Sequence, residues 1–347
     1  MLRHGPGRVE IARMGADDPD LMTFLRRAGL AEADETPSPV PLTGGVSSDI
    51  LRIDLKRGPV CIKRALAQLK VEQDWQAPVA RNAFEVAWME AANAIVPGAA
   101  PVVLAHDEAS RLFVMPFLAP DRYPLWKDEL RQGRVDLAAA AEVGRRLAAI
   151  HGASRNDAEV ARRFGSDDIF HAIRLEPYLE ATARAHPELA PRLMDLVRAT
   201  ATTREALVHG DVSPKNILLG PDGPVFLDAE CAWYGDPAFD VAFCLNHLLL
   251  KCLWTPPARH EFLAAFDALV AAYRDTIGEA GAAIEHRAAH LLPGLLLARV
   301  DGKSPVEYVS DEADKSLVRR VASALLKVPP PHLSDVRQAW NRALDGK

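Results

Sequence analysis

Two carboxylates and one amide stand at a spacing that suits phosphoryl chemistry in the second half of the chain. Asp211 follows a short apolar run ending at Val208, Asn216 comes five residues later, and Asp228 follows the next apolar stretch. Apolar runs separated by a polar loop predict a strand, a loop and a second strand. Magnesium prefers oxygen ligands, which Asn216 and Asp228 supply. With Asp211 orienting a hydroxyl group and accepting its proton, the set indicates phosphoryl transfer.

The order of these residues resembles that of a known enzyme family. His209-Gly210-Asp211, then Asn216, Asp228 and the segment Gly235-Asp236-Pro237-Ala238-Phe239-Asp240 are similar to the aminoglycoside phosphotransferase and choline kinase family. Its members are small-molecule kinases of the protein-kinase-like fold. A lone His-Gly-Asp is weak evidence, because aspartate is common in turns, whereas the ordered set is specific for fold and reaction type. The resemblance implies ATP and Mg²⁺ as cofactors and Asp211, Asn216 and Asp228 as catalytic residues.

The resemblance also implies a nucleotide-binding region upstream. Gly44, Gly45 and Ser47 lie in a turn whose backbone N–H groups would cover the phosphates, although the turn alone is typical of an ordinary hairpin. Lys63 lies inside an apolar strand and would hold the α- and β-phosphates. The alternative for Lys63 is a solvated residue on an edge strand.

A helix after Lys63 would supply its ion-pair partner. Glu85 lies twelve residues before Pro97, the spacing seen in similar enzymes, and Glu90 is the alternative. An exposed helix charge is the other interpretation of either residue. Further along, the resemblance places Met115 against the adenine ring. It implies that the carbonyl of Pro116 and the N–H of Leu118 meet the adenine edge, in a hinge at residues 116–118.

Several polar residues near Asp211 have two interpretations each. His209 is a possible acid or base, but its offset from Asp211 matches the position that braces the catalytic loop in the kinase-like fold that the chain resembles, which implies a structural role. Lys215 would touch the γ-phosphate or remain a solvated loop residue. Asp236 and Asp240 are predicted to brace the loop through hydrogen bonds to its backbone rather than to bind metal.

Two further residues are candidates for contact with the acceptor. Glu230 would point to the same side as Asp228 if that stretch is extended, and would then reach a second magnesium through water, or the acceptor. Arg299 lies in a segment that resembles the late arginine segment of methylthioribose kinases, which have twin arginines where this chain has Ala298 and Arg299. A helix C-terminus with favourable cations is the alternative for Arg299.

Composition excludes several classes of partner and predicts a reducing compartment. The 347 residues carry a net charge of −6, which gives no basic surface for nucleic acid and no polybasic membrane anchor. No CxxC pair occurs among the four cysteines, so free, mostly buried thiols and a cytoplasmic location are expected. The first ten residues lack the apolar core of a signal peptide. Nothing in the pattern indicates an oligomeric state.

The pattern of elements predicts an α+β, bilobal protein-kinase-like fold. A helical preface would occupy residues 1–35, an ATP-binding lobe with a small antiparallel sheet and one helix 36–118, and a mainly helical catalytic lobe 119–347. Apolar spacing predicts strands at Val102–Leu104 and Leu112–Met115. It predicts helices over Val135–His151 with Gly152 as C-cap, Asp167–Ala185, Pro187–Thr200, Val241–Leu253, Ala258–Ile277 and Ala282–Ala298.

These observations predict an ATP-dependent phosphotransferase acting on a hydroxyl of a small molecule. The tail from Pro329 to Lys347 is not acidic, which favours a sugar, sugar acid or amino alcohol over a polycationic aminoglycoside. The alternatives are a catalytically silent nucleotide-binding or scaffold protein and an aminoglycoside-type antibiotic kinase. A protein kinase is disfavoured, because nothing like its activation segment follows Asp228.

Overall fold

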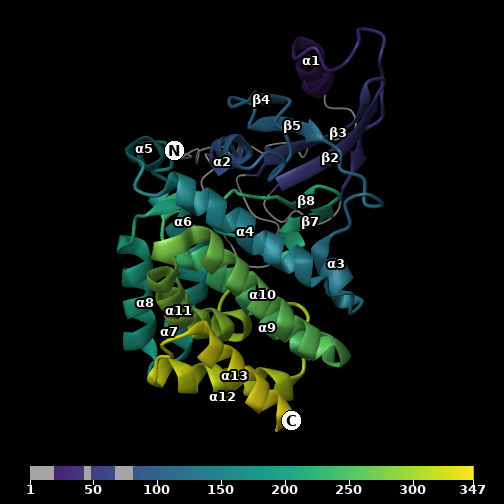
Figure 1. Cartoon of the computed structure of the whole chain (residues 1–347). Coiled ribbons are helices and arrows are strands. Elements are labelled where there is room, and N and C mark those ends of the chain that lie inside the picture. Colours follow the sequence, from purple (N-terminus) through teal and green to yellow (C-terminus); the bar gives the residue numbers. More distant parts are fainter. Residues whose placement is uncertain (1–18, 43–47, 67–80, 347) are drawn as a thin grey trace, which may run out of the picture. The chain divides into compact units, whose positions relative to one another are not determined.

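The computed structural model describes residues 19–42, 48–66 and 81–346 (Figure 1). The chain divides into two compact units. The smaller comprises Met1–Asn82 and Val103–Phe117, and the larger comprises Ala83–Val102 and Leu118–Lys347. The helix α2, Arg81–Ile95, begins at the end of the first of these ranges and continues in the larger unit.

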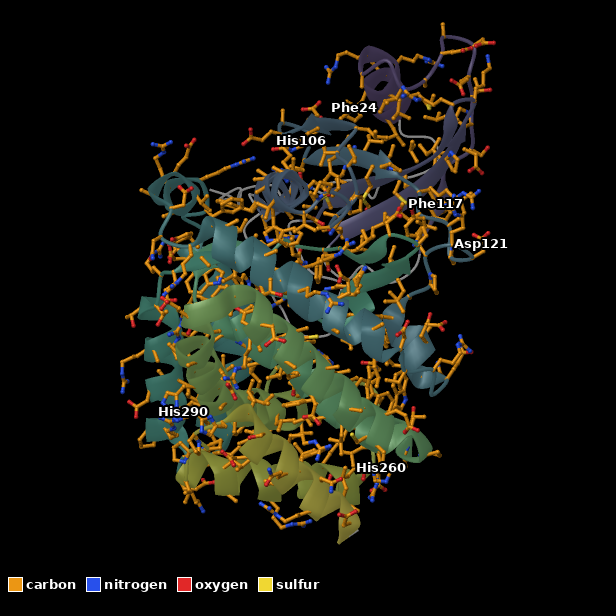
Figure 2. The ribbon with its side chains drawn as sticks, in the orientation of Figure 1. Phe24, His106, Phe117, Asp121, His260 and His290 are labelled. Atoms are coloured by element: carbon orange, nitrogen blue, oxygen red, sulfur yellow. The ribbon has the colours of Figure 1, made fainter. Side chains whose placement is uncertain are left out.

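The smaller unit contains an antiparallel sheet with the strand order β1-β2-β3-β5-β4. One face is covered by α1, Pro19–Arg27, whose Leu21, Phe24 and Leu25 join a buried cluster with side chains of β2, β3 and β5 (Phe24 is labelled in Figure 2). The strands are β1 Val40–Pro41, β2 Ser48–Leu55, β3 Gly58–Ala65, β4 Ala105–Asp107 and β5 Leu112–Pro116.

The strand predicted at Val102–Leu104 is wrong by several residues. The ladder with β5 starts at Ala105, which pairs with Val114, although the N–H of Leu104 still donates to the carbonyl of Val114 at 2.7 Å. Continuing the register would place Val103 opposite Pro116, which has no N–H to donate. Val102 is left 59% exposed, so this apolar run does not enter the core.

The larger unit is mainly helical and contains two short antiparallel hairpins. Strand β6, Ala206–Val208, pairs with β9, Trp233–Gly235, and β7, Ile217–Gly220, pairs with β8, Gly223–Phe226. The α+β prediction is therefore confirmed. Besides α2, the α-helices of this unit are α3 Trp126–Arg131, α4 Leu137–Ser154, α5 Ala158–Arg163, α6 Asp167–Phe170, α7 Ala181–Ala185, α8 Ala190–Thr202, α9 Ala238–Trp254, α10 Arg259–Ile277, α11 Gly281–Asp301, α12 Glu312–Lys327 and α13 Leu333–Asp345.

The helix α9 forms the centre of this unit. Every residue from Ala238 to Leu253 is buried, and α10 and α11 pack against it. On its other side α10 packs on α4, where a Cβ at Gly144 would lie 2.4 Å from the carbonyl oxygen of Leu269. Glycine is therefore required for the close approach of α4 and α10. No helix among the described residues is long and apolar enough to cross a membrane.

The predicted C-cap at Gly152 is wrong, because α4 continues to Ser154. The Ser154 hydroxyl donates to the carbonyl of Ile150 at 2.7 Å and accepts from the N–H of Leu207 at 2.9 Å. These two bonds hold the extra turn against β6. The predicted helices at Val241–Leu253, Ala258–Ile277 and Ala282–Ala298 are confirmed as α9, α10 and α11.

The segment predicted as one helix over Asp167–Ala185 is helical throughout but changes type in the middle. Between α6 and α7 lies the π-helix η1, His171–Glu180, with Pro177 inside it. Pro177 has no N–H for the α-helical ladder. π-helical turns are rare in proteins and are frequently found at functional sites.

Candidate catalytic site

The loop that carries Asp211 and Asn216 is fixed at both ends by strands of the larger unit. It leaves β6 at Val208, makes the short 3₁₀ helix η2, Pro214–Asn216, and enters β7. The N–H of Leu227 donates to the carbonyl of Asn216 at 2.8 Å, extending the β7–β8 pairing by one step. The backbone therefore brings Asn216 next to the segment that carries Asp228, as the predicted magnesium site requires.

The Asp211 carboxylate is buried and lies against two cations. Its Oδ2 lies 2.9 Å from an Arg174 guanidinium nitrogen and 3.3 Å from the Lys215 Nζ. Asn216 donates an amide N–H to the backbone carbonyl of Asp211 at 3.1 Å. That bond fixes the amide plane, with the amide oxygen on its opposite edge, available to a metal ion.

His209 holds the loop and has no free ring nitrogen. Its Nδ1 accepts the N–H of Asp211 at 3.1 Å, and its Nε2 lies 3.1 Å from the carbonyl oxygen of Leu227. A carbonyl only accepts, so Nε2 carries the proton and the ring is neutral. Burial lowers the pKa of His209, in agreement with a neutral ring. These contacts support a structural role for His209 rather than a role as acid or base.

Asp240 braces the loop from α9. Its carboxylate accepts the N–H groups of His209 and Gly210, each at 2.8 Å, and lies 3.2 Å from the Nε2 of His151. The predicted bracing role of Asp240 is thus found in the structure. Asp236, which was predicted to brace the loop as well, instead contacts the start of α9. Its carboxylate accepts the N–H of Ala238 at 3.0 Å, at the start of α9, and pairs with Arg287.

Gly210 is the one loop position where a side chain has no room. Its φ is +80°, and a Cβ there would lie 2.7 Å from the carbonyl oxygen of Cys231. Both the backbone conformation and the space therefore require glycine. The loop is pressed directly onto the backbone that follows Asp228.

Arg174 is a site residue that the sequence analysis missed. It comes from the π-helix η1, is buried, and donates through Nε to the carbonyl of Gly210 at 2.5 Å as well as pairing with Asp211. One signal was present in the sequence: an arginine stands between the apolar residues Ile173 and Leu175 of a segment predicted to be helical. Nothing local connects that arginine to a loop later in the chain.

The stretch after Asp228 does not have the extended backbone on which the prediction for Glu230 depended. Asp228 has φ +64°, and the N–H of Ala232 donates to the carbonyl of Ala229 at 3.0 Å, which closes a turn. The condition for Glu230 to point to the same side as Asp228 is therefore not met, and its contact with the acceptor or with a second magnesium stays a prediction. Aspartate tolerates the left-handed region better than most residues, and such conformations are concentrated at functional sites.

The acids on α2 differ sharply in their surroundings. Glu85 is buried, whereas Glu90 is exposed and pairs with Arg163 at 2.7 Å. Three residues after Glu85 on the same helix, Trp88 packs edge-on against the His209 ring at 4.6 Å between ring centroids. Glu85 is thus the buried acid of the two, its pairing with Lys63 stays a prediction, and Trp88 attaches α2 to the catalytic loop.

Lys63 lies on the central strand of the smaller unit and is buried. Strand β3 lies between β2 and β5, with Lys63 paired with Ile50 on one side and Phe113 on the other. The alternative of a solvated edge lysine is therefore wrong. The predicted phosphate-covering residues Gly44, Gly45 and Ser47 lie outside the described residues. Met115 and Pro116 end β5 and Leu118 follows; all three are partly exposed.

The protein donors for magnesium are few. No group of three His, Cys, Asp or Glu side chains among the described residues is arranged to hold a metal ion. The Asn216 amide and the Asp228 carboxylate are hard oxygen donors that suit Mg²⁺, which usually keeps waters and phosphate oxygens as its other ligands. The donor set therefore fits a metal that arrives with a nucleotide.

Arg299 lies in the last turn of α11 and is buried there. It donates to the Tyr178 hydroxyl at 3.0 Å and to the Ser304 hydroxyl at 3.1 Å. A solvated cation at a helix end does not describe it, since its side chain reaches inward to η1.

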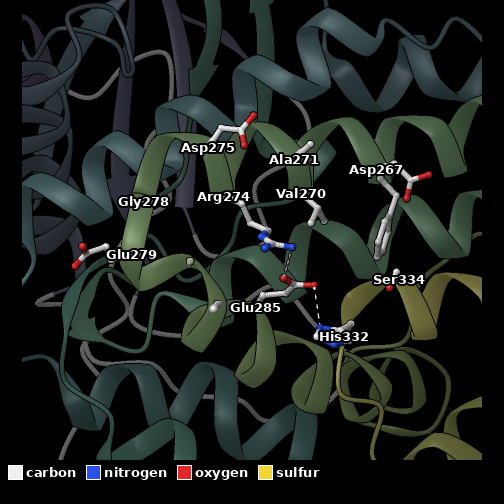
Figure 3. A pocket seen from close by; sticks show the side chains of 13 residues that line it. Asp267, Val270, Ala271, Arg274, Asp275, Gly278, Glu279, Glu285, His332 and Ser334 are labelled. Carbon is white, nitrogen blue, oxygen red and sulfur yellow. Dashed lines mark ion pairs between the residues drawn. The ribbon is translucent and has the colours of Figure 1, made fainter.

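One cavity of the larger unit lies apart from the catalytic loop. It has a volume of about 620 Å³ and is lined by α10, α11 and residues at the start of α13 (Figure 3). Across it, Glu285 pairs with Arg274 at 2.9 Å and lies 3.9 Å from His332. None of the loop residues lines it, so the site is identified from the geometry of the loop.

The chain is similar to known proteins in both sequence and fold. Residues 38–276 match the model of the phosphotransferase enzyme family called APH. The chain belongs to this phosphotransferase family. Among curated relatives, methylthioribose kinase of Yersinia pseudotuberculosis is 26% identical over 226 residues, covering 57% of this chain and 54% of the relative. Methylthioribose kinase of Bacillus thuringiensis is 24% identical over 230 residues, covering 59% and 58%.

The chain thus spans about half the length of the curated relatives it matches. Solved structures extend the likeness at the level of the fold. Choline kinase from Cryptosporidium parvum has a TM-score of 0.52 at 11% identity, covering 94% of each chain. Amicoumacin kinase has a TM-score of 0.51 at 16% identity, covering 92% of this chain and 97% of that one. The predicted kinase-like fold of the family is confirmed.

Proposed function

We propose that this protein transfers the γ-phosphoryl group of MgATP to a hydroxyl group of a small molecule. The observation that carries the proposal is the buried Asp211, held in a loop that also fixes Asn216 beside the Asp228 segment. Family membership and the relatives named methylthioribose kinase support the reaction type. The amicoumacin kinase structure contains AMP-PNP and Ca²⁺, which supports a nucleotide with a divalent metal.

In this proposal each residue has one task. The acceptor oxygen forms a bond to the γ-phosphorus while the bond to the β–γ bridging oxygen breaks, and Asp211 orients the hydroxyl and accepts its proton. Asn216 and Asp228 hold magnesium, which supplies charge neutralisation at the phosphates. Lys63, paired with Glu85, holds the α- and β-phosphates, and Gly44, Gly45 and Ser47 cover them. Met115, Pro116 and Leu118 contact the adenine.

Arg174 and His209 position the base in this reaction. Arg174 contacts both the carbonyl of Gly210 and the carboxylate of Asp211, and His209 holds the N–H of Asp211. The charge of Asp211 raises the pKa of Lys215. Lys215 is half exposed and would remain charged beside the transferred phosphoryl group.

Binding of the nucleotide should depend on magnesium. Because Asn216 and Asp228 act through the metal, MgATP should raise the melting temperature substantially, and ATP with chelator should raise it much less. A ligand at a hundred times its Kd stabilises the folded state by about 2.7 kcal/mol. Thermal shift with MgATP, ATP plus EDTA and MgCl₂ alone is the measurement. Equal shifts with and without chelator would remove the metal role of both residues.

A further inference from the structure

Two buried basic side chains of the larger unit form no ion pair with an acidic side chain among the described residues. Lys251 of α9 is 1% exposed and contacts the faces of two rings, with Nζ 4.2 Å from the Trp254 centroid and 4.8 Å from that of Tyr308. Arg299 is 8% exposed, bonds only to neutral oxygens of Tyr178 and Ser304, and its Nε has no partner.

Glu307 and Asp128, the acids that act electrostatically on Lys251, form no ion pair with it in the described part of the chain. Glu307 pairs with Lys127, and three basic side chains gather at the Trp254 ring: Lys251, Lys127 at 6.0 Å and Arg131 at 5.6 Å. Buried charges in proteins are normally paired, because removing an ion from water is costly. An arginine has no neutral form available in a protein, so Arg299 remains a cation.

A third polar side chain, His247, interacts electrostatically with both Arg299 and Lys251 and has one ring nitrogen without a partner among the described residues. His247 of α9 is buried, and its Nδ1 lies 3.1 Å from the Tyr308 hydroxyl, while its Nε2 has no partner among the described residues. In the tautomer that accepts the Tyr308 hydroxyl, Nε2 carries a proton and is an unused donor. Lys251, Arg299 and His247 form what we call the basic cluster.

The basic cluster is joined to Asp211 by direct contacts. Arg174, the partner of Asp211, lies over the Tyr178 ring at 5.8 Å, and Arg299 lies over the same ring at 5.4 Å. Phe243 makes a second connection, since Arg174 lies 5.7 Å from its ring and the His247 ring is 5.5 Å away. These contacts all lie within the larger unit, so the cluster belongs to the surroundings of the proposed base.

Resting on the function proposed above, we propose that the acceptor is an anionic hydroxyl compound whose carboxylate or phosphate group binds the basic cluster at Lys251 and Arg299. The anion supplies the negative charge that Lys251 and Arg299 lack as an ion-pair partner. Because the basic cluster is in contact with the surroundings of Asp211, the acceptor hydroxyl would lie near that carboxylate. The same cluster repels polycations, which excludes aminoglycosides as the preferred acceptors. Neutral sugars would leave the buried charges unpaired.

The test compares acceptors that share a carbon skeleton and differ in one group. Glycerol, glycerate, glycerol 3-phosphate and 3-amino-1,2-propanediol present neutral, carboxylate, phosphate and ammonium forms of one skeleton, and a five-carbon alditol series repeats the comparison. Binding is measured by calorimetry at constant ionic strength with Mg²⁺ and AMP-PNP present. The pH is 6.0, because burial lowers the pKa of Lys251 to about 7. Inorganic phosphate serves as an anion without a skeleton.

An anionic member should bind at least about tenfold more tightly than its neutral and ammonium counterparts, which is about 1.4 kcal/mol. Lys251→Met keeps the packing volume and should abolish that preference, and Arg299→Gln should do the same as a second variant. Lys315→Met, on the surface of α12, is the matched control and should keep it. The relative affinity for glycerate and glycerol 3-phosphate distinguishes carboxylate from phosphate.

Equal affinity across the series, or a preference that persists in both variants, would overturn the anionic acceptor. That outcome leaves the kinase reaction standing, provided that MgATP binds and any hydroxyl compound is phosphorylated. Conversely, an anion preference in a protein that neither binds MgATP nor consumes it would overturn the proposed function and leave the anion site. The two failures therefore have different signatures.

Discussion

Asp211→Asn should lower turnover on the acceptor by about 10²–10⁴-fold, the usual contribution of a positioned base. Asparagine keeps the shape of the side chain, and its amide oxygen still accepts from Arg174, but it does not take a proton. Binding of MgATP should change little, because Asp211 acts on the acceptor. Steady-state kinetics and calorimetry on the same preparation measure the two properties separately.

Asp228→Asn gives the contrasting result. It should lose magnesium-dependent nucleotide binding together with turnover, because Asp228 is the proposed metal ligand. Asp222→Asn, an exposed carboxylate in the β7–β8 turn, is the matched control and should behave like the parent.

If Asp211→Asn turns over within about threefold of the parent, well outside the expected range, the base is another carboxylate. Glu230 would then be examined first.

Asp240→Asn should destabilise the larger unit by roughly 3–5 kcal/mol, because it disturbs two backbone hydrogen bonds to a buried carboxylate and bonds to charged groups are worth about 1.5–3 kcal/mol each. The carboxylate is fully buried and accepts from two backbone N–H groups while facing His151. An asparagine would turn its own N–H donors toward at least one of those groups and leave a donor unsatisfied.

The expected fall in melting temperature is on the order of 10 °C, since about 1 kcal/mol shifts a unit of this size by 2–4 °C. Differential scanning calorimetry measures it. Asp195→Asn on α8, whose carboxylate is 54% exposed, is the comparison and should change the melting temperature little. A loss below about 1 kcal/mol, comparable to a surface substitution, would show that the loop does not depend on Asp240.

Sequence patterns were sufficient where the information is local. The apolar spacing of the helices predicts α9, α10 and α11 correctly. The apolar runs on either side of the loop also place Asp211 and Asn216 correctly between β6 and β7, and Asp228 correctly after β8. The structural role of His209 followed from the resemblance of its offset from Asp211 to that of the bracing position in the kinase-like fold. Such inferences work because helix and strand periods are properties of neighbouring residues.

The remaining features depend on contacts between distant segments or on backbone angles. Arg174 reaches Asp211 from a π-helix that periodicity does not reveal. Lys251 is only an interruption of an apolar run until Trp254 and Tyr308 are seen around it. The extended backbone on which the direction of Glu230 depended is not formed, because Asp228 adopts a positive φ, which its residue type allows but does not dictate.

The burial of Lys251 also links folding to proton release. Burial lowers its pKa from 10.5 to about 7, and its charged neighbours are Lys127, Glu307 and Asp128. Between these two pH values the unfolded chain binds a proton at Lys251 that the folded chain has given up, so this residue makes the fold more stable as pH rises from 7 to 10.5. The destabilisation by Lys251 reaches its full value below pH 7, where this lysine is charged in both the folded and the unfolded chain. Chemical denaturation of Lys251→Met against the parent should therefore show a stability advantage for methionine that is largest near neutrality and vanishes at alkaline pH. If the proposed anion binds at Lys251, it would offset the same loss of stability. Part of the free energy that favours an anionic acceptor would then come from the cost of burying this ammonium group without an ion-pair partner.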